Sequence, residues 1–455
     1  MRLQHHKIAT RLLLLSLVFL ACASATKRLE QGAELEQQGR YTEAAMRYIQ
    51  ALRKDPYLPE AREGLARVGA QAITQNRTDA ARFRALGSFV QAADLYRASD
   101  DLVAAAASVG VPLAVADGYA ASRRTIFDEA IDHLLHLART AEAKSLWAEA
   151  LAAYEQVALY EPRPRHEMDV LVGRVRASVL WGEADLASGH YRAAFQHAEA
   201  ALALLAGRAL PGDPRGGDSL GSPEPTWAER AQNVRDEALN LGTVRAALTP
   251  VRAAGKATAR ELPEGFLEAL NDELEARHWT QPPLFVAVLD PLLVRRELRR
   301  YGLVHSAPSQ RDAMRLGRDV GADFVVSMTM DAFAGTDTEV VTERHAARTR
   351  AGADTTYTVF KGKRLYTMAA SLVVLDIAHG REARRRSVEV SESGRFTRAH
   401  YDGDPRQLKL LDSERRLFDA HREREQEQEI QDRLIEKAGV QLAGQVFDDL
   451  VSCVP

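Results

Sequence analysis

The sequence has few cysteines, few aromatic residues and no strong excess of either charge. Its 455 residues include two cysteines, Cys22 and Cys453, so the single intrachain disulfide available would join the two ends of the chain. Aromatic residues make up 6% of the chain, whereas Ala and Arg are abundant, which suits closely packed helices with small residues at their contacts. A chain of this length exceeds one hydrophobic core and predicts two or three domains.

The charge balance gives no support for nucleic-acid binding. Lys and Arg number 60 against 63 Asp and Glu, a formal net charge of -3. The first 21 residues contribute Arg2, Lys7 and Arg11 and no acid, so their removal leaves 57 basic and 63 acidic groups, a net charge of -6. Nucleic-acid-binding domains usually carry a basic excess. We therefore expect no nucleic-acid partner.

Zinc and nucleotide sites lack their minimum residue sets. The sequence contains no H-E-x-x-H, no G-x-x-x-x-G-K-[ST] and no Cys/His cluster. His133 and His136 have the spacing of two metal ligands on a helix, but no further ligand is nearby, so a solvated or packed pair is expected. The acidic "YDGDP" (401–405) lacks the spaced oxygen ligands of a calcium loop and predicts a polar turn. We expect a protein that is not an enzyme and that holds no metal and no cofactor.

The amino terminus follows the plan of a secretory signal peptide. Residues 1–11 carry positive charges, residues 12–20 are almost purely apolar, and small residues follow. The apolar core is shorter than the roughly 20 residues that a membrane-spanning helix needs. We therefore expect residues 1–21 to be cleaved.

Phe19, Leu20 and Ala21 precede Cys22 and resemble the lipobox of bacterial lipoproteins. The resemblance implies acylation of Cys22 by fatty chains such as palmitate, and several chains on one residue anchor a protein stably. Phe19 departs from the usual Leu, and ordinary signal-peptidase cleavage after Ala23 or Ala25 stays open. Ala23 in place of Asp implies, by similarity to enteric lipoproteins, export to the periplasmic side of the outer membrane. Cys453 would then be a small buried apolar residue.

The stretch "GRYTEAAMRYIQALRKDP" (39–56) resembles the tetratricopeptide repeat. Small residues stand where that repeat brings two antiparallel helices together, aromatic residues fill the remaining gaps, and a proline ends the second helix. The residues in these roles are Gly32, Tyr41, Ala44, Tyr48, Ala51 and Pro56.

The pattern recurs in residues 145–162 and 188–202 and, more weakly, in 87–99. The matching residues are Trp147, Ala150, Tyr154 and Pro162 in the first, and Gly182, Tyr191 and Ala194 in or just before the second. Unequal spacing between the copies predicts extra helices between them. We therefore predict an all-α tetratricopeptide-like solenoid over residues 22–206. Such an array typically holds a peptide or a partner helix on its concave face, although a spacer or a dimerisation surface stays open.

Residues 207–226 are rich in Gly and Pro and predict a flexible linker. After it, helices alternate with strands, which predicts a layered α/β domain with a mixed sheet over residues 227–455. Three strands are expected within 355–393, with turns at Gly362 and Gly380. The last helix, from about residue 413, carries an apolar stripe that should dock on the sheet, formed by Ile430, Leu434, Leu442, Val446 and Leu450.

The order of elements around "VGADFVVSMTM" and "AASLVVLDIAHGREA" resembles the α/β domain shared by the curli-secretion lipoprotein CsgG and the penicillin-binding-protein activator LpoB. The resemblance covers roughly residues 243–451. It implies that Gly321, Ala322 and Asp323 lead from a helix into a central strand, and that Asp376 and Gly380 close a later hairpin.

One segment departs from the curli transporter, which builds a pore from added amphipathic strands. The corresponding residues 339–356 bring Glu343, Arg344, His345, Arg348 and Arg350 close together, which lipid would reject. We therefore expect an outer-membrane-anchored scaffold or regulator of envelope machinery, bound to protein partners through the repeats and the α/β domain. An oligomeric secretion component is the alternative, and either protein is compatible with a homo-oligomer.

Overall fold

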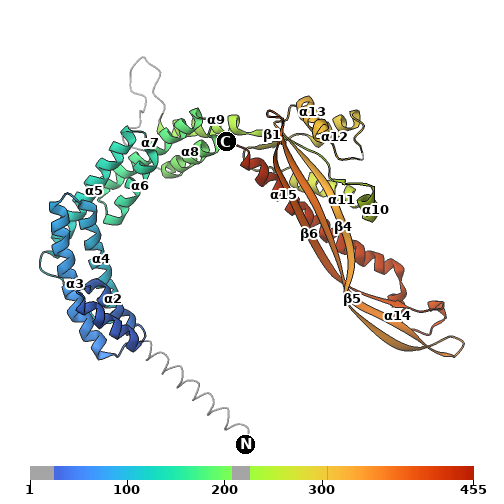
Figure 1. Ribbon diagram of the computed structural model, residues 1–455, viewed down its shortest axis with the longest axis horizontal. Helices are drawn as coiled ribbons and strands as arrows, with labels where there is room; N and C mark the ends of the chain where they lie inside the picture. The colour runs from blue at the N-terminus through green and yellow to red at the C-terminus, as the bar shows by residue number, and fades with distance from the viewer. Residues whose placement is uncertain (1–24, 207–225, 305) are drawn as a thin grey trace, which may run out of the picture. The chain divides into compact units, whose positions relative to one another are not determined.

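The computed structural model describes residues 25–206, 226–304 and 306–455 (Figure 1). The chain divides into two compact units, one formed by residues up to 184 with 196–234, and the other by 185–195 with 235–455. We call them the helical unit and the α/β unit. The predicted order, a helical part followed by an α/β part, is confirmed. Most of the predicted linker, residues 207–225, lies outside the described residues.

Helices make up the first half of the chain, where residues 25–37 are helical as well. Sequential neighbours from α2 to α6 pack against one another. In bounds, the elements are α2 (Tyr41–Leu52), α3 (Pro59–Ala85), α4 (Phe89–Ser108), α5 (Tyr119–Ala143), α6 (Trp147–Val157), η1 (Ala158–Tyr160), α7 (Pro164–Ala187), α8 (Tyr191–Leu205) and α9 (Trp227–Gly242).

Glycines allow these helices to approach the tyrosines packed between them. A Cβ atom added to Gly32 or Gly64 would lie 2.8 Å from a ring carbon of Tyr48, which is buried between the two glycines. At Gly173 of α7, an added Cβ would lie 2.5 Å from Cε1 of Tyr154 in α6, and closer still to the end of the same ring. These distances are below normal van der Waals contact, so any side chain at these positions would force the helices apart.

The α/β unit is built on a mixed sheet in the order β3-β1-β4-β5-β6, with β2 paired to β4. β1 is parallel to β3 and β4, whereas β5 is antiparallel to both β4 and β6. The strands are β1 (Val244–Leu248), β2 (Arg252–Ala253), β3 (Val286–Val288), β4 (Phe324–Arg348), β5 (Asp354–Asp376) and β6 (Arg381–His400).

Helices cover both faces of this sheet. α11 (Phe266–Glu273) and α15 (Ala420–Ser452) pack on the face that carries Val326, Met328 and Leu372. α12 (Pro291–Arg300) and α13 (Gln310–Val320) pack on the other face, against Ala247, Val325 and Leu375. The remaining short elements are α10 (Lys256–Glu261), η2 (Leu274–His278), η3 (Pro405–Gln407), α14 (Asp412–Arg415) and η4 (Arg416–Phe418).

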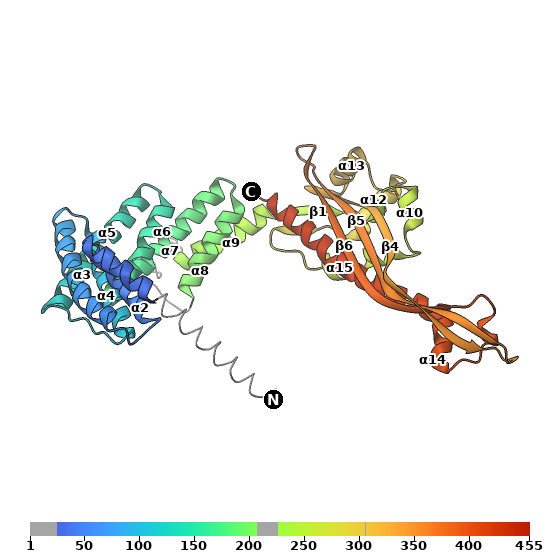
Figure 2. The ribbon, with the colours of Figure 1, turned by 60° about the horizontal axis from the view of Figure 1, so that its bottom comes forward.

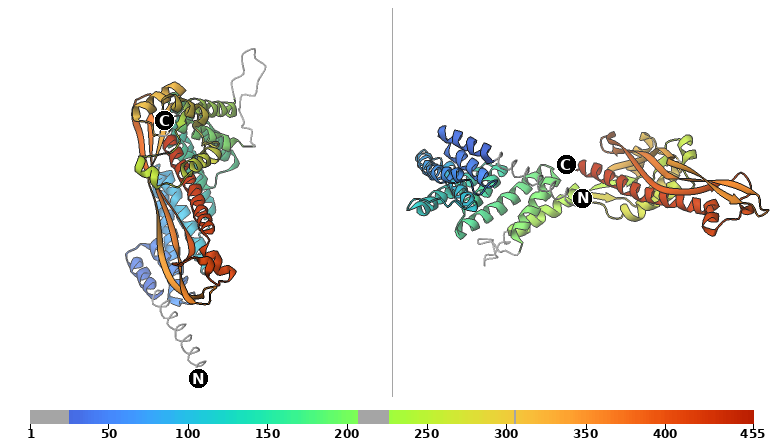
Figure 3. Two further views of the ribbon diagram at one scale, coloured as in Figure 1. Left: turned by 90° about the vertical axis from the view of Figure 1, so that its right-hand side faces the viewer. Right: turned by 90° about the horizontal axis from the view of Figure 1, so that it is seen from below.

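The long helix α15 runs along the strands (Figure 3). The predicted apolar stripe of Ile430, Leu434, Leu442, Val446 and Leu450 is buried in its contact with the sheet. Lys437 Nζ also donates to the carbonyl of Ser391 at 2.8 Å. This bond ties α15 to β6, the last strand in the order of the described sheet.

The Gly-Ala-Asp segment joins α13 to β4, the central strand. Gly321 ends α13 with φ +66°, a left-handed conformation that favours glycine. Ala322 is buried, and Asp323 exchanges two hydrogen bonds with Arg245. The Oδ2 atom of Asp323 accepts from the Arg245 N–H at 2.7 Å, and the Asp323 N–H donates to the Arg245 carbonyl at 2.8 Å. These bonds hold the start of β4 beside β1.

The predicted turn at Gly362 is wrong, and so is the division of residues 355–393 into three strands. Gly362 lies within β5 opposite Phe396 of β6, and a Cβ atom there would meet the Phe396 ring and the Thr338 carbonyl, each at 3.0 Å. Gly362 therefore permits close packing inside the sheet and does not end a strand. The turn at Gly380 is confirmed, because Gly380 has φ +68° between β5 and β6.

Strand β4 continues through residues 341–348, which pair with residues 354–361 of β5, so β4 and β5 form one long hairpin (Figure 2). Glu339 has φ +54° at a bulge between Thr338 and Val341. Near the far end of the hairpin, Tyr357 and Val359 form a small core with Leu408 and Leu410.

Within the described ranges no helix is both long and apolar enough to cross a membrane.

Two helical glycines should respond to alanine with opposite signs. Gly173→Ala should lower the free energy of unfolding by about 1–3 kcal/mol, because the new methyl group overlaps the Tyr154 ring. Gly444→Ala in α15 should raise it by about 0.5–1 kcal/mol, because nothing lies within 4 Å of the added carbon and alanine favours helix. Urea unfolding of the full chain, followed by far-UV circular dichroism, measures both. A Gly173→Ala protein as stable as the parent would contradict the packing described for α6 and α7.

Candidate functional site

The predicted repeat residues lie mostly at buried helix contacts. The described structure buries Gly32, Ala44, Tyr48, Ala51, Ala150, Tyr154, Gly182 and Ala194, leaves Tyr41, Trp147, Pro162 and Tyr191 half-buried, and exposes Pro56. Tyr191 and Ala194 belong to the α/β unit, whereas Gly182 belongs to the helical unit. The third predicted copy of the repeat is therefore divided between the two units.

Two of the copies share a polar arrangement that the repeat pattern did not reveal. The Tyr48 hydroxyl donates to Glu36 at 2.9 Å, and Arg67 donates to the same carboxylate at 2.8 Å. In the second copy Tyr154 donates to Glu142 at 2.9 Å, and Arg176 donates to Glu142 at 2.9 Å. In both copies the tyrosine follows its glutamate by 12 residues.

The glycine against each tyrosine ring precedes the arginine by three positions, as Gly64 precedes Arg67 and Gly173 precedes Arg176. We call each set a Glu-Tyr-Gly-Arg quartet. Both sets share one sequence signal, a tyrosine 12 residues after a glutamate followed by G-x-x-R in the next helix. The weak copy at 87–99 lacks the quartet, since Arg84 stands 12 residues before Tyr96 and pairs with Glu129 instead.

The pKa shifts within the quartets indicate a structural role for these residues. Burial, followed by the hydrogen bond to Glu36, raises the pKa of Tyr48 to about 12. The hydrogen bond from Arg67 holds the pKa of Glu36 below its ordinary 4.5. Burial and Glu142 likewise raise the pKa of Tyr154. Both phenols therefore stay protonated near neutral pH, and neither is a nucleophile.

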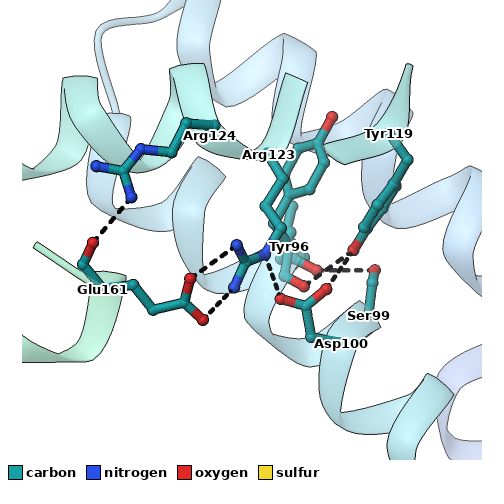
Figure 4. Close-up of polar contacts among 8 residues, drawn as sticks. Tyr96, Ser99, Asp100, Tyr119, Arg123, Arg124 and Glu161 are labelled. Carbon is teal, nitrogen blue, oxygen red and sulfur yellow. Dashed lines mark hydrogen bonds and ion pairs between the residues drawn. The ribbon is translucent and has the colours of Figure 1, made fainter. Parts of the chain in front are cut away.

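A second polar cluster joins α4, α5 and the end of η1 (Figure 4). Arg123 donates to Asp100 at 2.5 Å and to both carboxylate oxygens of Glu161, at 3.0 and 2.5 Å. The Tyr119 hydroxyl donates to Asp100 at 2.9 Å. Glu161 has φ +51°, and its carbonyl accepts from Arg124 at 2.9 Å, which holds this strained backbone in place. Because its charged groups are paired with one another, the cluster fixes the helices and offers no free group for catalysis.

The predicted histidine pair does not form a metal site with other residues of the described chain. The His133 ring lies 5.6 Å from the Phe89 ring, centroid to centroid, in a packing contact between α5 and α4. Over the described ranges no group of three or more His, Cys, Asp or Glu side chains is arranged to hold a metal ion. The segment 401–405 likewise contributes to no such group.

An apolar hollow of about 420 Å³ lies along α5 and α6. Leu137 and Leu146 line it and remain 44% and 42% exposed. Ala152 and Ala153 of α6 also line it and contribute small apolar side chains. We call this surface the α5–α6 hollow. It has the size and apolar character of a site that receives one or two side chains of a partner.

The α/β unit contains a larger cavity, of about 560 Å³, between β2, α11 and α12. Leu262, Leu298 and Leu303 contribute apolar surface, whereas Arg252, Arg295 and Arg299 contribute positive charge. We call it the α11–α12 cavity. Sequence patterns gave no sign of it, because its residues come from four separate segments.

The chain has two cysteines and one serine motif that could be reactive. Cys22 lies outside the described residues. Cys453, at the end of α15, is a half-buried free thiol whose pKa is raised by burial, so it is a poor nucleophile. The sequence also contains a G-x-S-x-G pattern, "GDSLG" at residues 217–221, which lies in the predicted linker and outside the described residues.

Comparison with known proteins gives no family. No family model matches the chain, and no curated protein matches it. Sixteen chains of solved structures match. Among them is lipoprotein GNA1162 from Neisseria meningitidis, at 12% identity and a TM-score of 0.21, with 33% of this chain and 84% of that chain covered. The hypothetical protein CT253 from Chlamydia trachomatis matches at 14% identity and a TM-score of 0.23, with 44% of this chain and 96% of that chain covered.

The contact between Glu36 and Arg67 should weaken in acid. The pKa of Glu36 in the folded protein lies below 4.5, so the contribution of the ion pair is complete above that pH and is lost as the pH falls through the folded value. Arg67→Met should therefore lower stability by about 0.5–1 kcal/mol near neutral pH, and the difference from the parent protein should shrink below pH 4.5. Hydrogen exchange of the α2 and α3 amides measures this difference. A difference that is independent of pH would contradict the assignment.

Proposed function

We propose that this protein is a lipid-anchored scaffold that binds a protein partner in the bacterial cell envelope. The observation that carries the proposal is the α5–α6 hollow. It leaves Leu137 and Leu146 open to solvent on a helical unit whose neighbouring charged clusters are paired internally. Exposed apolar surface within a hollow favours binding over chemistry.

The partner that suits this surface is an amphipathic helix or an extended peptide with an apolar anchor. The hollow lies between two antiparallel helices, which is the setting in which helix-in-groove recognition occurs. Lys144 and Glu149 line its rim and supply one charge of each sign for orienting polar contacts. The quartet of Glu142, Tyr154, Gly173 and Arg176 fixes α5 against α6 and α7, so the hollow is formed before the partner arrives.

The anchor is proposed from the sequence. Positive charge, a short apolar run and the residues Phe19-Leu20-Ala21 before Cys22 resemble a lipoprotein signal. Attachment to the periplasmic side of the outer membrane is part of the proposal.

Acylation of Cys22 is tested by its removal. Cys22→Ala should abolish labelling of the protein by a fatty-acid analogue and release the protein from the membrane fraction, because several acyl chains are what hold it there. Ser24→Ala, two residues away, serves as the control and should fractionate as the parent protein does. Unchanged fractionation of Cys22→Ala would rule out this anchor.

Partner binding is tested by site-specific photocrosslinking in cells. A photoreactive residue at position 137 should crosslink to one defined protein, because Leu137 lines the hollow. The same residue at position 57 is the control, since Tyr57 is 89% exposed and lies outside the hollow. Leu137→Asp should lower the yield of a crosslink from position 146 at least tenfold, about 1.4 kcal/mol of binding energy. Equal crosslinking from positions 57 and 137 would argue against a partner at this surface.

A second candidate, an oligomeric secretion component, is favoured by the length of the β4–β5 hairpin. Its strands of 25 and 23 residues exceed the roughly 10 that a membrane-spanning strand needs. Against a lipid-facing role, Lys361 pairs with Glu343 at 2.6 Å and Lys363 with Glu339 at 2.8 Å across the two strands. A large ring in detergent extracts with conductance in planar bilayers would support the secretion role, whereas a monomer or dimer without conductance would support the scaffold.

A further inference from the structure

A buried amide lies in the wall of the α11–α12 cavity. The side chain of Asn271 in α11 accepts from the Val251 N–H at 2.7 Å and donates to the Val251 carbonyl at 3.2 Å. It also donates to the Leu267 carbonyl at 2.6 Å, so all its bonds are made within the fold. This buried amide fixes the backbone beside Arg252 against α11 and places the Arg252 side chain in the wall of the cavity.

Arg252 is the unusual group in this cavity. It is half-buried, and no side chain or carbonyl of the described chain makes a hydrogen bond or an ion pair with its guanidinium. Burial, and next the positive charge of Arg295, lower the pKa of Arg252, and the negative charge of Glu275 offsets only part of this shift. A half-buried cation without a partner is costly, and such groups are normally paired.

The other charged residues around the cavity are separated by sign, with arginines on α12 and acids on or just before α11. Arg295 and Arg299 extend from α12, one turn apart, and Arg295 is already bonded to Glu275 at 2.5 Å. Glu264, Glu268 and Asp272 come from α11 and the loop before it, at intervals of four residues. None of these three acids lies within 4 Å of a described Lys, Arg or His nitrogen, Arg252 and Arg299 included, although all line one cavity.

We propose that the α11–α12 cavity binds a zwitterionic ligand of the amino-acid or short-peptide class, with its carboxylate on Arg252 and its ammonium on the acids of α11. An arginine presents paired N–H donors that match a carboxylate, and Arg299 adds a second cation. The three acids repel a ligand that carries only negative charge. Leu262, Leu298 and Leu303 offer apolar contact for one aliphatic side chain, and the volume of about 560 Å³ suits a molecule of this size.

The test uses the full chain and four probes. Alanyl-leucine is the zwitterion, N-acetyl-alanyl-leucine lacks the ammonium group, alanyl-leucinamide lacks the carboxylate, and inorganic phosphate is a simple anion. Calorimetric titration should show binding of alanyl-leucine and at least tenfold weaker binding of each of the other three. Tight binding of phosphate, or equal binding of the acetylated and free peptides, would overturn the proposed ligand class.

Arg252→Met tests the residue itself. It should weaken binding of alanyl-leucine at least tenfold, whereas Arg311→Met, which removes an exposed arginine of α13 outside the cavity, should leave it unchanged.

The same variant separates binding from a structural role. Without ligand, Arg252→Met should unfold at a higher temperature than the parent protein, because it removes an unpaired, half-buried charge. An arginine that served only the fold would lower that temperature on removal. A destabilised Arg252→Met protein, or one that binds the dipeptide as tightly as the parent, would overturn the proposal.

Discussion

The helical unit depends on one contact that occurs twice, a tyrosine ring packed directly on a glycine of the next helix. Tyr48 lies against Gly64, and Tyr154 against Gly173, at distances that leave no room for a Cβ atom. Such close approach buries the hydroxyl end of the ring, which then needs a hydrogen-bond acceptor. Glu36 and Glu142 supply it, and each glutamate in turn needs the arginine that pairs with it. The glycine therefore requires the rest of its quartet.

The α/β unit uses glycine in the same way to bring a helix onto the sheet. A Cβ atom at Gly394 of β6 would lie 2.6 Å from Cγ1 of Ile430 in α15, and one at Gly317 of α13 would lie 2.5 Å from Cδ1 of Ile377. Both glycines sit where an apolar side chain of another element presses on the backbone. The proposed binding surfaces lie outside these contacts, in the α5–α6 hollow and the α11–α12 cavity. Hydrogen bonds of the Tyr154 quartet and of Asn271 fix the helices beside these two surfaces.

Sequence periodicity predicted the order of the elements well because each helix and most strands carry their own apolar pattern. The stripe from Ile430 to Leu450 is one example. The place of the Gly-Ala-Asp segment, by contrast, was implied by the resemblance to a known domain and not by periodicity. Gly362 shows where prediction from the local sequence alone fails. Glycine within a strand pattern indicates either a turn or a close approach, and the ring of Phe396 that decides between them lies on a different strand. The hollow and the cavity escaped prediction for a related reason, since each combines ordinary residues from elements that only the fold brings together.

Two arginines of the α/β unit are shielded from solvent, but they differ in their carboxylate partners. The side chain of Arg364 is 11% exposed, and carboxylates surround it: Asp337 at 2.7 Å, Glu423 at 3.7 Å and Glu427. These partners offset the cost of removing the guanidinium from water. Arg252 is shielded as well but has no such partner in the described chain, while three acids lie in the same cavity beyond ion-pair distance. Because Arg364 is fully paired, the absence of a partner for Arg252 within the described chain is best explained by a ligand that binds reversibly. The space between Arg252 and the three acids is where the carboxylate and the ammonium group of a zwitterion would bind.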